Sequence, residues 1–159
     1  MSSLDPIVIV SAVRTPMGGF GGCLSPVTAP ELGASAIKAA VSQANLANDQ
    51  IDEVIMGCVL PAGLKQAPAR QASIAEELAL STVCTTINKV CGSGMKAAMQ
   101  AHDALLAGSI DVAIAGGMES MSNAPYILPK ARTGMRMGHG QVLDHMMLDG
   151  LENAYDGIS

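Results

Sequence analysis

A cysteine with two following glycines, Cys91-Gly92-Ser93-Gly94, lies where a strand-like segment ends and a helix-forming segment begins. Amide N–H groups and the positive end of a helix dipole favour a thiolate at such a position. A thiolate is a usable nucleophile, and glycines let a bulky substrate approach the backbone closely. Buried cysteines are also commonly small hydrophobic side chains, so the position alone leaves a catalytic role and a packing role open.

A second chemical interpretation of this segment is a dinucleotide site. Residues 92–97 fit the pattern G-x-G-x-x-A after an expected strand, and Asp111 follows about 20 residues later, as the fingerprint requires. The acidic residue of that fingerprint lies at the far end of the second strand, however, whereas Asp111 comes before its expected strand. The pattern therefore favours this module less than a cysteine nucleophile, and the module remains an alternative.

The remaining cysteines and histidines form no recognisable ligand set. The other thiols make neither a C-x-x-C pair nor a zinc spacing, so we expect no metal site. We also expect no bound cofactor. We expect one of the three histidines on a helix and two in loops. The residues concerned are Cys23, Cys58, Cys84, His102, His139 and His145.

The elements that must position Cys91 alternate along the chain, which predicts an α/β fold with a layered sheet. Thr28 and Glu31 predict a capping box at the start of the first helix. The apolar, β-branched residues Ile7 to Val13 predict a strand buried on both faces. The expected strands are 7–13, 54–60, 83–90 and 111–115, and the expected helices are 28–45, 68–80 and 92–107.

The character of the chain changes after Gly117. Residues 118–159 are rich in Met, Gly and Pro, and their apolar residues follow neither the period of a helix nor that of a strand over any length. We therefore expect an α/β domain over residues 1–117 and a loop-rich domain over residues 118–159.

Composition limits the classes of partner. A formal charge of −5, few aromatic side chains and no long basic run disfavour nucleic-acid binding. No apolar stretch approaches the roughly 20 residues that span a bilayer, and the start lacks the features of a signal peptide, so we expect no membrane partner and a cytoplasmic location. With 14% charged residues and a mean hydropathy of +0.34, some apolar surface should be covered by another subunit or by another piece of chain, and we expect an oligomer.

Four segments, in this order and at this spacing, resemble the thiolase family over essentially the whole chain. They are Val10-Ser-Ala-Val-Arg-Thr-Pro16, Gln66-Ala-Pro-Ala-Arg-Gln-Ala72, Asn88-Lys-Val-Cys-Gly-Ser-Gly94 and Ala115-Gly-Gly-Met-Glu-Ser-Met-Ser122. The last segment favours thiolases over the related ketoacyl synthases. The resemblance implies the first half of a thiolase fold, with a buried catalytic helix, followed by the start of a loop domain that holds coenzyme A.

The resemblance also implies a reaction. Cys91 would take up an acyl group as a thioester and pass it to coenzyme A or acetyl-CoA, and its own N–H would serve as one oxyanion donor. Acyl-CoA is then a substrate, and the complete protein would be a homo-oligomer, dimeric or tetrameric. Residues Leu151 and Ser159 fall where the family lines its pantetheine and acyl pocket.

The family's other reactive groups come from a carboxyl-terminal half that this sequence does not contain. They are a histidine that activates the nucleophile, an asparagine- and histidine-based oxyanion site and a second cysteine. We therefore expect this chain to be an inactive fragment of an acetyl-CoA C-acyltransferase when it is alone. A non-catalytic truncated scaffold is the alternative that the sequence leaves open besides the dinucleotide module.

Overall fold

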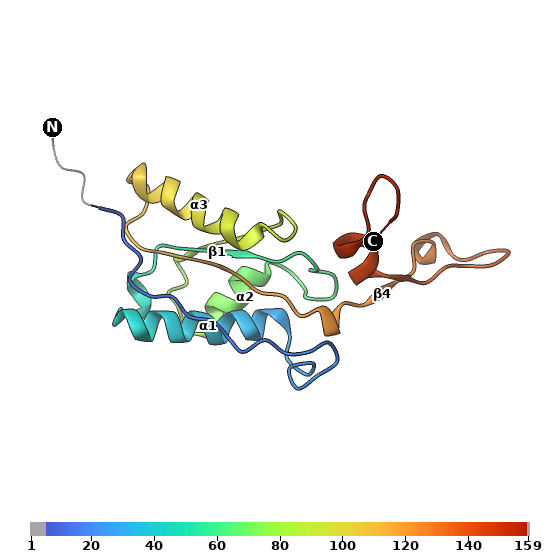
Figure 1. The fold of residues 1–159 in the computed structure, drawn as a ribbon, viewed down its shortest axis with the longest axis horizontal. Coiled ribbons are helices and arrows are strands. Elements are labelled where there is room, and N and C mark those ends of the chain that lie inside the picture. Colours follow the sequence, from blue (N-terminus) through green and yellow to red (C-terminus); the bar gives the residue numbers. More distant parts are fainter. Residues whose placement is uncertain (1–5, 159) are drawn as a thin grey trace.

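The computed structural model of the chain describes residues 6–158, and its main body has three layers. A parallel three-stranded sheet lies in the middle, with α1 and α2 on one face and α3 on the other (Figure 1). The helices and strands of this body are α1 (Ala29–Ala44), the short 3-10 helix η1 (Asn48–Gln50), β1 (Glu53–Gly57), α2 (Pro68–Ala75), β2 (Val83–Ile87), α3 (Ser93–Leu106) and β3 (Ala113–Gly117). The alternation of strand and helix that the sequence predicts is confirmed.

The central strand β1 places its side chains alternately in two cores. It pairs in parallel with β2 on one side and with β3 on the other, which gives the order β2-β1-β3. Val54 and Met56 pack with α1 and α2, whereas Ile55 packs with Ala97 and Ala101 of α3. A strand covered by helices on both faces is apolar throughout, so the residues of β1 are mostly buried.

The start of α1 is the capping box that the sequence predicts. The carboxylate of Glu31 accepts hydrogen bonds from the backbone N–H of Thr28 at 2.8 Å and from its hydroxyl at 2.7 Å. These bonds, the hydroxyl's first, lower the pKa of Glu31. The helix ends before Asn45, which takes the left-handed conformation that asparagine tolerates.

Three strands differ from their expected bounds because side-chain oxygens accept the backbone N–H groups next to the strand ends. The Glu119 carboxylate accepts the N–H groups of Val59 and Leu60, so β1 stops at Gly57. The Asn88 side chain accepts the Val90 N–H after β2. The Asp52 carboxylate accepts the N–H groups that precede β3, which therefore starts at Ala113.

Helix α2 is also shorter than the expected 68–80, because a helix-ending turn closes at residues 76–78. Glu77 has a φ of 56°, and the N–H of Leu78 reaches back to the carbonyl of Ser73 at 3.3 Å. This is a Schellman-type end without glycine. The guanidinium of Arg70 then holds the following segment by donating to the carbonyls of Leu80 and Thr82.

The expected buried strand at residues 7–13 is wrong. The structure has no strand there, and Val8 and Ile9 are 64% and 88% exposed. The segment runs beside α1, where the Ser11 hydroxyl donates to Gln43 (Figure 1). An apolar run favours a strand, but a strand also needs a hydrogen-bonding partner. Within the described residues the sheet ends at β2 on one side and at β3 on the other, and residues 7–13 pair with neither of these edge strands.

Helix α3 is buried along the face that packs on the sheet, and its other face is exposed. Ser93, Ala97 and Ala101 face the sheet and are buried. On the opposite face Met95 is 72% exposed and Met99 is 59% exposed. The outer face of α3 therefore exposes three large apolar side chains beside the polar side chains of His102 and Asp103. We call Met95, Met99 and Leu106 the open α3 face.

The chain after Gly117 forms short elements beside this body (Figure 1). They are η2 (Met121–Asn123), β4 (Tyr126–Ile127), η3 (Ala131–Thr133), β5 (Leu143–Asp144) and the π-helical turn η4 (Met147–Leu151), with β4 and β5 paired antiparallel. Within residues 6–158, none of the helices has the length and apolar character needed to cross a bilayer.

Candidate functional site

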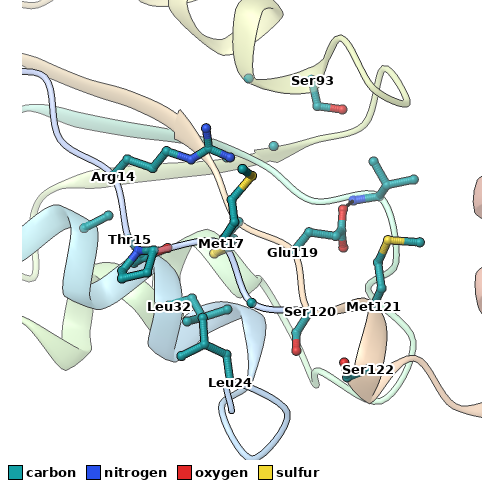
Figure 2. A pocket seen from close by; sticks show the side chains of 18 of the residues that line it. Arg14, Thr15, Met17, Leu24, Leu32, Ser93, Glu119, Ser120, Met121 and Ser122 are labelled. Atoms are coloured by element: carbon teal, nitrogen blue, oxygen red, sulfur yellow. Dashed lines mark hydrogen bonds between the residues drawn. The ribbon is translucent and has the colours of Figure 1, made fainter. Parts of the chain in front are cut away.

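A cleft of about 630 Å³ lies at the carboxyl ends of β1 and β3, beside the start of α3. Its walls come from four segments that are far apart in sequence, and Figure 2 shows the side chains of several of them. Open α/β sheets commonly bind ligands at this edge. The lining residues are 13–20, 57 and 59, 90, 91, 93 and 94, and 117–122, together with residues 24, 25, 32 and 36 of the loop and helix that follow the first segment.

Cys91 lies in this cleft, at the turn between β2 and α3, as the sequence predicts. Cys91 is exposed, and α3 begins two residues later, at Ser93. The N–H groups of Gly92 and Ser93 donate to the carbonyls of Lys89 and Val90, both at 3.1 Å. The turn is thus closed by its own backbone, with the thiol open to the cleft.

The residue before the cysteine is strained. Val90 has a φ of 49°, which is an outlier for a β-branched residue. The Ser93 hydroxyl donates to the Val90 carbonyl at 2.6 Å and accepts the Lys89 N–H at 2.8 Å. Strained backbone persists only where its surroundings fix it, and it gathers at functional sites. The hydroxyl of Ser93 is one of the groups that fix this turn.

The start of α3 packs directly on the end of β1. A Cβ atom added to Gly57 would lie 2.5 Å from the Cβ of Ser93 and 3.0 Å from its carbonyl carbon. Only glycine allows this approach, because real Cβ atoms do not come so close. Gly57 therefore sets the height of the Cys91 turn above the sheet.

Glu119 faces the cleft from the segment after β3 and binds the loop after β1 (Figure 2). Its carboxylate accepts the N–H groups of Val59 at 2.7 Å and Leu60 at 3.0 Å, and it lies 3.7 Å from the sulfur of Cys58. Burial first, and then the charge of Glu119, raise the pKa of the Cys58 thiol to about 12. Cys58 therefore stays protonated at neutral pH and is no nucleophile.

Arg14 brings a cation to the same cleft. It comes from the segment Arg14-Thr15-Pro16, and in Figure 2 its guanidinium reaches from that segment toward the middle of the cleft. A guanidinium offers five donors to an anion or a carbonyl oxygen. The cleft thus combines an exposed thiol, a carboxylate and a guanidinium.

The other residues singled out from the sequence lie elsewhere. Leu151 ends η4, is 49% exposed and is not among the residues of the cleft, while Ser159 lies outside the described residues. His145, expected to be a loop residue, starts the helical turn before η4 and is buried. Its Nδ1 lies 2.5 Å from the Asp149 carboxylate, and its Nε2 accepts the Ala62 N–H at 3.4 Å.

Sequence reasoning missed Glu119 and Arg14 as residues of the site. Both belong to segments that carry the family resemblance, which was the available signal, but their roles depend on contacts with residues about 60 or more positions away. The cysteines of the described chain are free thiols. No group of three or more His, Cys, Asp or Glu side chains within residues 6–158 is arranged to hold a metal ion.

Comparisons with known proteins agree with this fold. Residues 7–159 match the family described as "Thiolase, N-terminal domain". The acetyl-CoA acetyltransferases of Cupriavidus necator and Escherichia coli are 52% and 54% identical over 153 and 152 residues, which is 96% and 94% of this chain. Those matches cover 39% and 38% of the two relatives, so the chain spans about two fifths of their length.

A solved structure shows the same fold. The Acat5 thiolase from Ascaris suum, crystallised in complex with coenzyme A, aligns with a TM-score of 0.90 and 42% sequence identity. The alignment covers 94% of this chain and 38% of that one. A match of this quality at this identity establishes the fold that the sequence predicts.

Proposed function

This chain belongs to the thiolase family by its amino-terminal domain, and from that premise we propose that it supplies the nucleophile of an acetyl-CoA acetyltransferase. The observation that carries the proposal is the exposed Cys91 thiol at the head of α3, inside the cleft. The substrate class is acyl-CoA, because the named relatives are acetyl-CoA acetyltransferases and a thiolase of this fold was crystallised with coenzyme A.

In the proposed reaction the Cys91 thiolate attacks the carbonyl carbon of an acyl-CoA thioester. A new C–S bond forms to Cys91, the C–S bond to coenzyme A breaks, and the departing thiolate takes up a proton. The acyl group then passes to the sulfur of coenzyme A or to the α-carbon of acetyl-CoA, and the acceptor atom loses a proton as the new bond forms. The C–S bond between the acyl group and Cys91 breaks, and the released Cys91 thiolate takes up a proton, which regenerates the thiol. The Cys91 N–H is proposed as one donor to the negative oxygen of the tetrahedral intermediate.

The proposal assigns the activating base and the second oxyanion donor to residues outside these 159, as the resemblance implies. The chain alone is then expected to show neither condensation nor thiolysis, because a thiol without its base and complete oxyanion site lacks the groups that lower the barrier. The carboxyl-terminal three fifths of the Escherichia coli relative, added in trans, should restore turnover that Cys91→Ala abolishes.

The cleft itself is tested by affinity labelling of the chain. Chloroacetyl-CoA, an alkylating acyl-CoA analogue, should label Cys91 faster than chloroacetamide does, and acetyl-CoA should protect the thiol. Cys23, which is also exposed, is the internal control and should react with both reagents without protection. Equal labelling of the two cysteines by chloroacetyl-CoA, without protection, would contradict the proposal.

We extend the proposal to the oligomeric state, the domain boundary and the cellular location of the protein. The open α3 face supports a homo-oligomer, because several large apolar side chains exposed on one helix often mark a contact site. We place the domain boundary near Gly117, where the layered body ends and the short elements begin. The free thiols favour the reducing cytoplasm. The dinucleotide module has no support left, since the glycine pattern lies in a thiolase fold.

A further inference from the structure

The carboxylate of Glu119 is connected by hydrogen bonds to the turn that carries Cys91. Glu119 follows β3, yet its carboxylate accepts hydrogen bonds from the thiol of Cys58 and from two backbone N–H groups, those of Val59 and Leu60, in the loop after β1. The two bonds from backbone N–H groups have a charged acceptor, which makes them stronger than neutral hydrogen bonds. The loop after β1 is therefore fixed by the segment that follows the neighbouring strand β3.

That loop in turn contacts the segment before the cysteine. The carbonyl of Val59 accepts a hydrogen bond from the side-chain N–H of Asn88 at 3.4 Å, the longest contact in the series. The side-chain oxygen of Asn88 accepts the N–H of Val90 at 2.8 Å. One amide side chain thus joins the loop that Glu119 holds to the residue that precedes Cys91.

The turn needs such support because its backbone is strained. The left-handed conformation of Val90 costs roughly 1–2 kcal/mol for a residue with a Cβ atom. The conformation is kept when the bonds around it are present, and two of those bonds come from Asn88 and Ser93. Loosening the Asn88 side chain removes one of the two and lets the turn relax.

We propose that Glu119 is a positioning residue for the Cys91 nucleophile, acting through the Val59 loop and the Asn88 side chain. The inference rests on the proposed function, in which Cys91 is the reacting group. Glutamine cannot replace Glu119 in this role. One of its two terminal atoms is a donor, so either the Val59 N–H or the Leu60 N–H would face another N–H group.

The test is the rate at which iodoacetamide alkylates Cys91, measured by mass spectrometry relative to Cys23 in the same chain. In Glu119→Gln the Cys91 rate should fall about two- to fivefold, the size of a lost helix-terminus interaction, while the Cys23 rate stays constant. Glu119→Asp keeps both oxygens and should recover part of the loss. The matched control is Glu31→Gln, which removes another carboxylate with two local bonds, outside the cleft.

A double-mutant cycle tests the path itself. Asn88→Ala should lower the Cys91 rate by a similar factor, and the combination with Glu119→Gln should lower it little further, because both changes cut one series of contacts. Additive effects would overturn the path through Asn88. An unchanged Cys91 rate in Glu119→Gln, or an equal loss in Glu31→Gln, would overturn the positioning role.

The outcome is separable from that of the proposed function. Iodoacetamide carries no coenzyme A moiety, so its rate reports the state of the Cys91 turn alone. If chloroacetyl-CoA shows no preference for Cys91 while the iodoacetamide rates follow the predicted pattern, the acyl-CoA proposal fails and the positioning of the thiol stands. Should a variant fail to fold, the other substitution at Glu119 and the Asn88 variant still decide the question.

Discussion

Replacing Gly57 by alanine should destabilise the chain by forcing α3 away from the sheet beneath Cys91. The new Cβ would lie 2.5 Å from the Ser93 Cβ, 3.0 Å from the Ser93 carbonyl carbon and 3.1 Å from the Gly94 nitrogen. Carbon atoms in contact lie about 3.5–4.0 Å apart, so the first turn of α3 must move by roughly 1 Å. Two of the three atoms are backbone, and a change of rotamer cannot relieve the overlap.

The expected magnitude follows from two opposing effects. Overpacking of this kind costs about 1–3 kcal/mol, whereas replacing glycine by alanine stabilises the folded state by about 0.4–1 kcal/mol through the unfolded chain. The net loss in the free energy of unfolding should be about 1–2 kcal/mol. For a chain of this length that lowers the melting midpoint by about 2–8 °C.

The assay is thermal unfolding followed by circular dichroism, with Gly94→Ala as the matched control. A Cβ on Gly94 would meet its nearest atoms, those of Gly116, at 3.9 Å, which is ordinary contact. Gly94 is the second residue of α3, and replacing glycine by alanine without strain stabilises a protein by about 0.4–1 kcal/mol through the unfolded chain, so this variant should melt higher than the parent chain. A Gly57→Ala midpoint equal to or above that of the parent would refute the close approach of α3 to β1.

Three further predictions concern stability, reactivity and association. The N–H donors of Val112 and then Asp111 lower the pKa of Asp52, so its contribution is complete above the ordinary value of 3.8 and is lost as pH falls through the folded pKa. In urea titrations the stability lost in Asp52→Asn should therefore shrink on acidification, and a difference independent of pH would contradict this. Cys58, with its pKa raised to about 12 mainly by burial, should resist iodoacetamide in the native chain at pH values where exposed thiols react, and rapid labelling without unfolding would count against it. The isolated chain should sediment as an oligomer or aggregate at micromolar concentration, with contacts around residues 112–122 and the open α3 face, because apolar surface and strand edges favour pairing; a monodisperse monomer with a cooperative melt would show otherwise.

The sequence alone determined the features that depend on neighbours along the chain. The capping box of Thr28 and Glu31 joins residues three positions apart, and its geometry follows from the start of one helix. The position of Cys91 between a strand and a helix follows in the same way from the pattern on either side. The family resemblance then predicted the fold and the nucleophile, because the order and spacing of the four matching segments are specific to one family, whereas the periodicity of apolar residues predicts only helices and strands.

Only the tertiary structure decided where the strands end and what holds the cysteine turn. The limits of β1 and β3 are set by the carboxylates of Glu119 and Asp52, each about 60 residues from the N–H groups that it binds. The sequence could not predict that residues 7–13 are exposed, because whether an apolar segment becomes a strand depends on a pairing partner elsewhere in the chain. Helix and strand propensity and helix capping depend on residues within a few positions of one another. These hydrogen bonds, by contrast, form only after the chain has brought distant segments to one edge of the sheet.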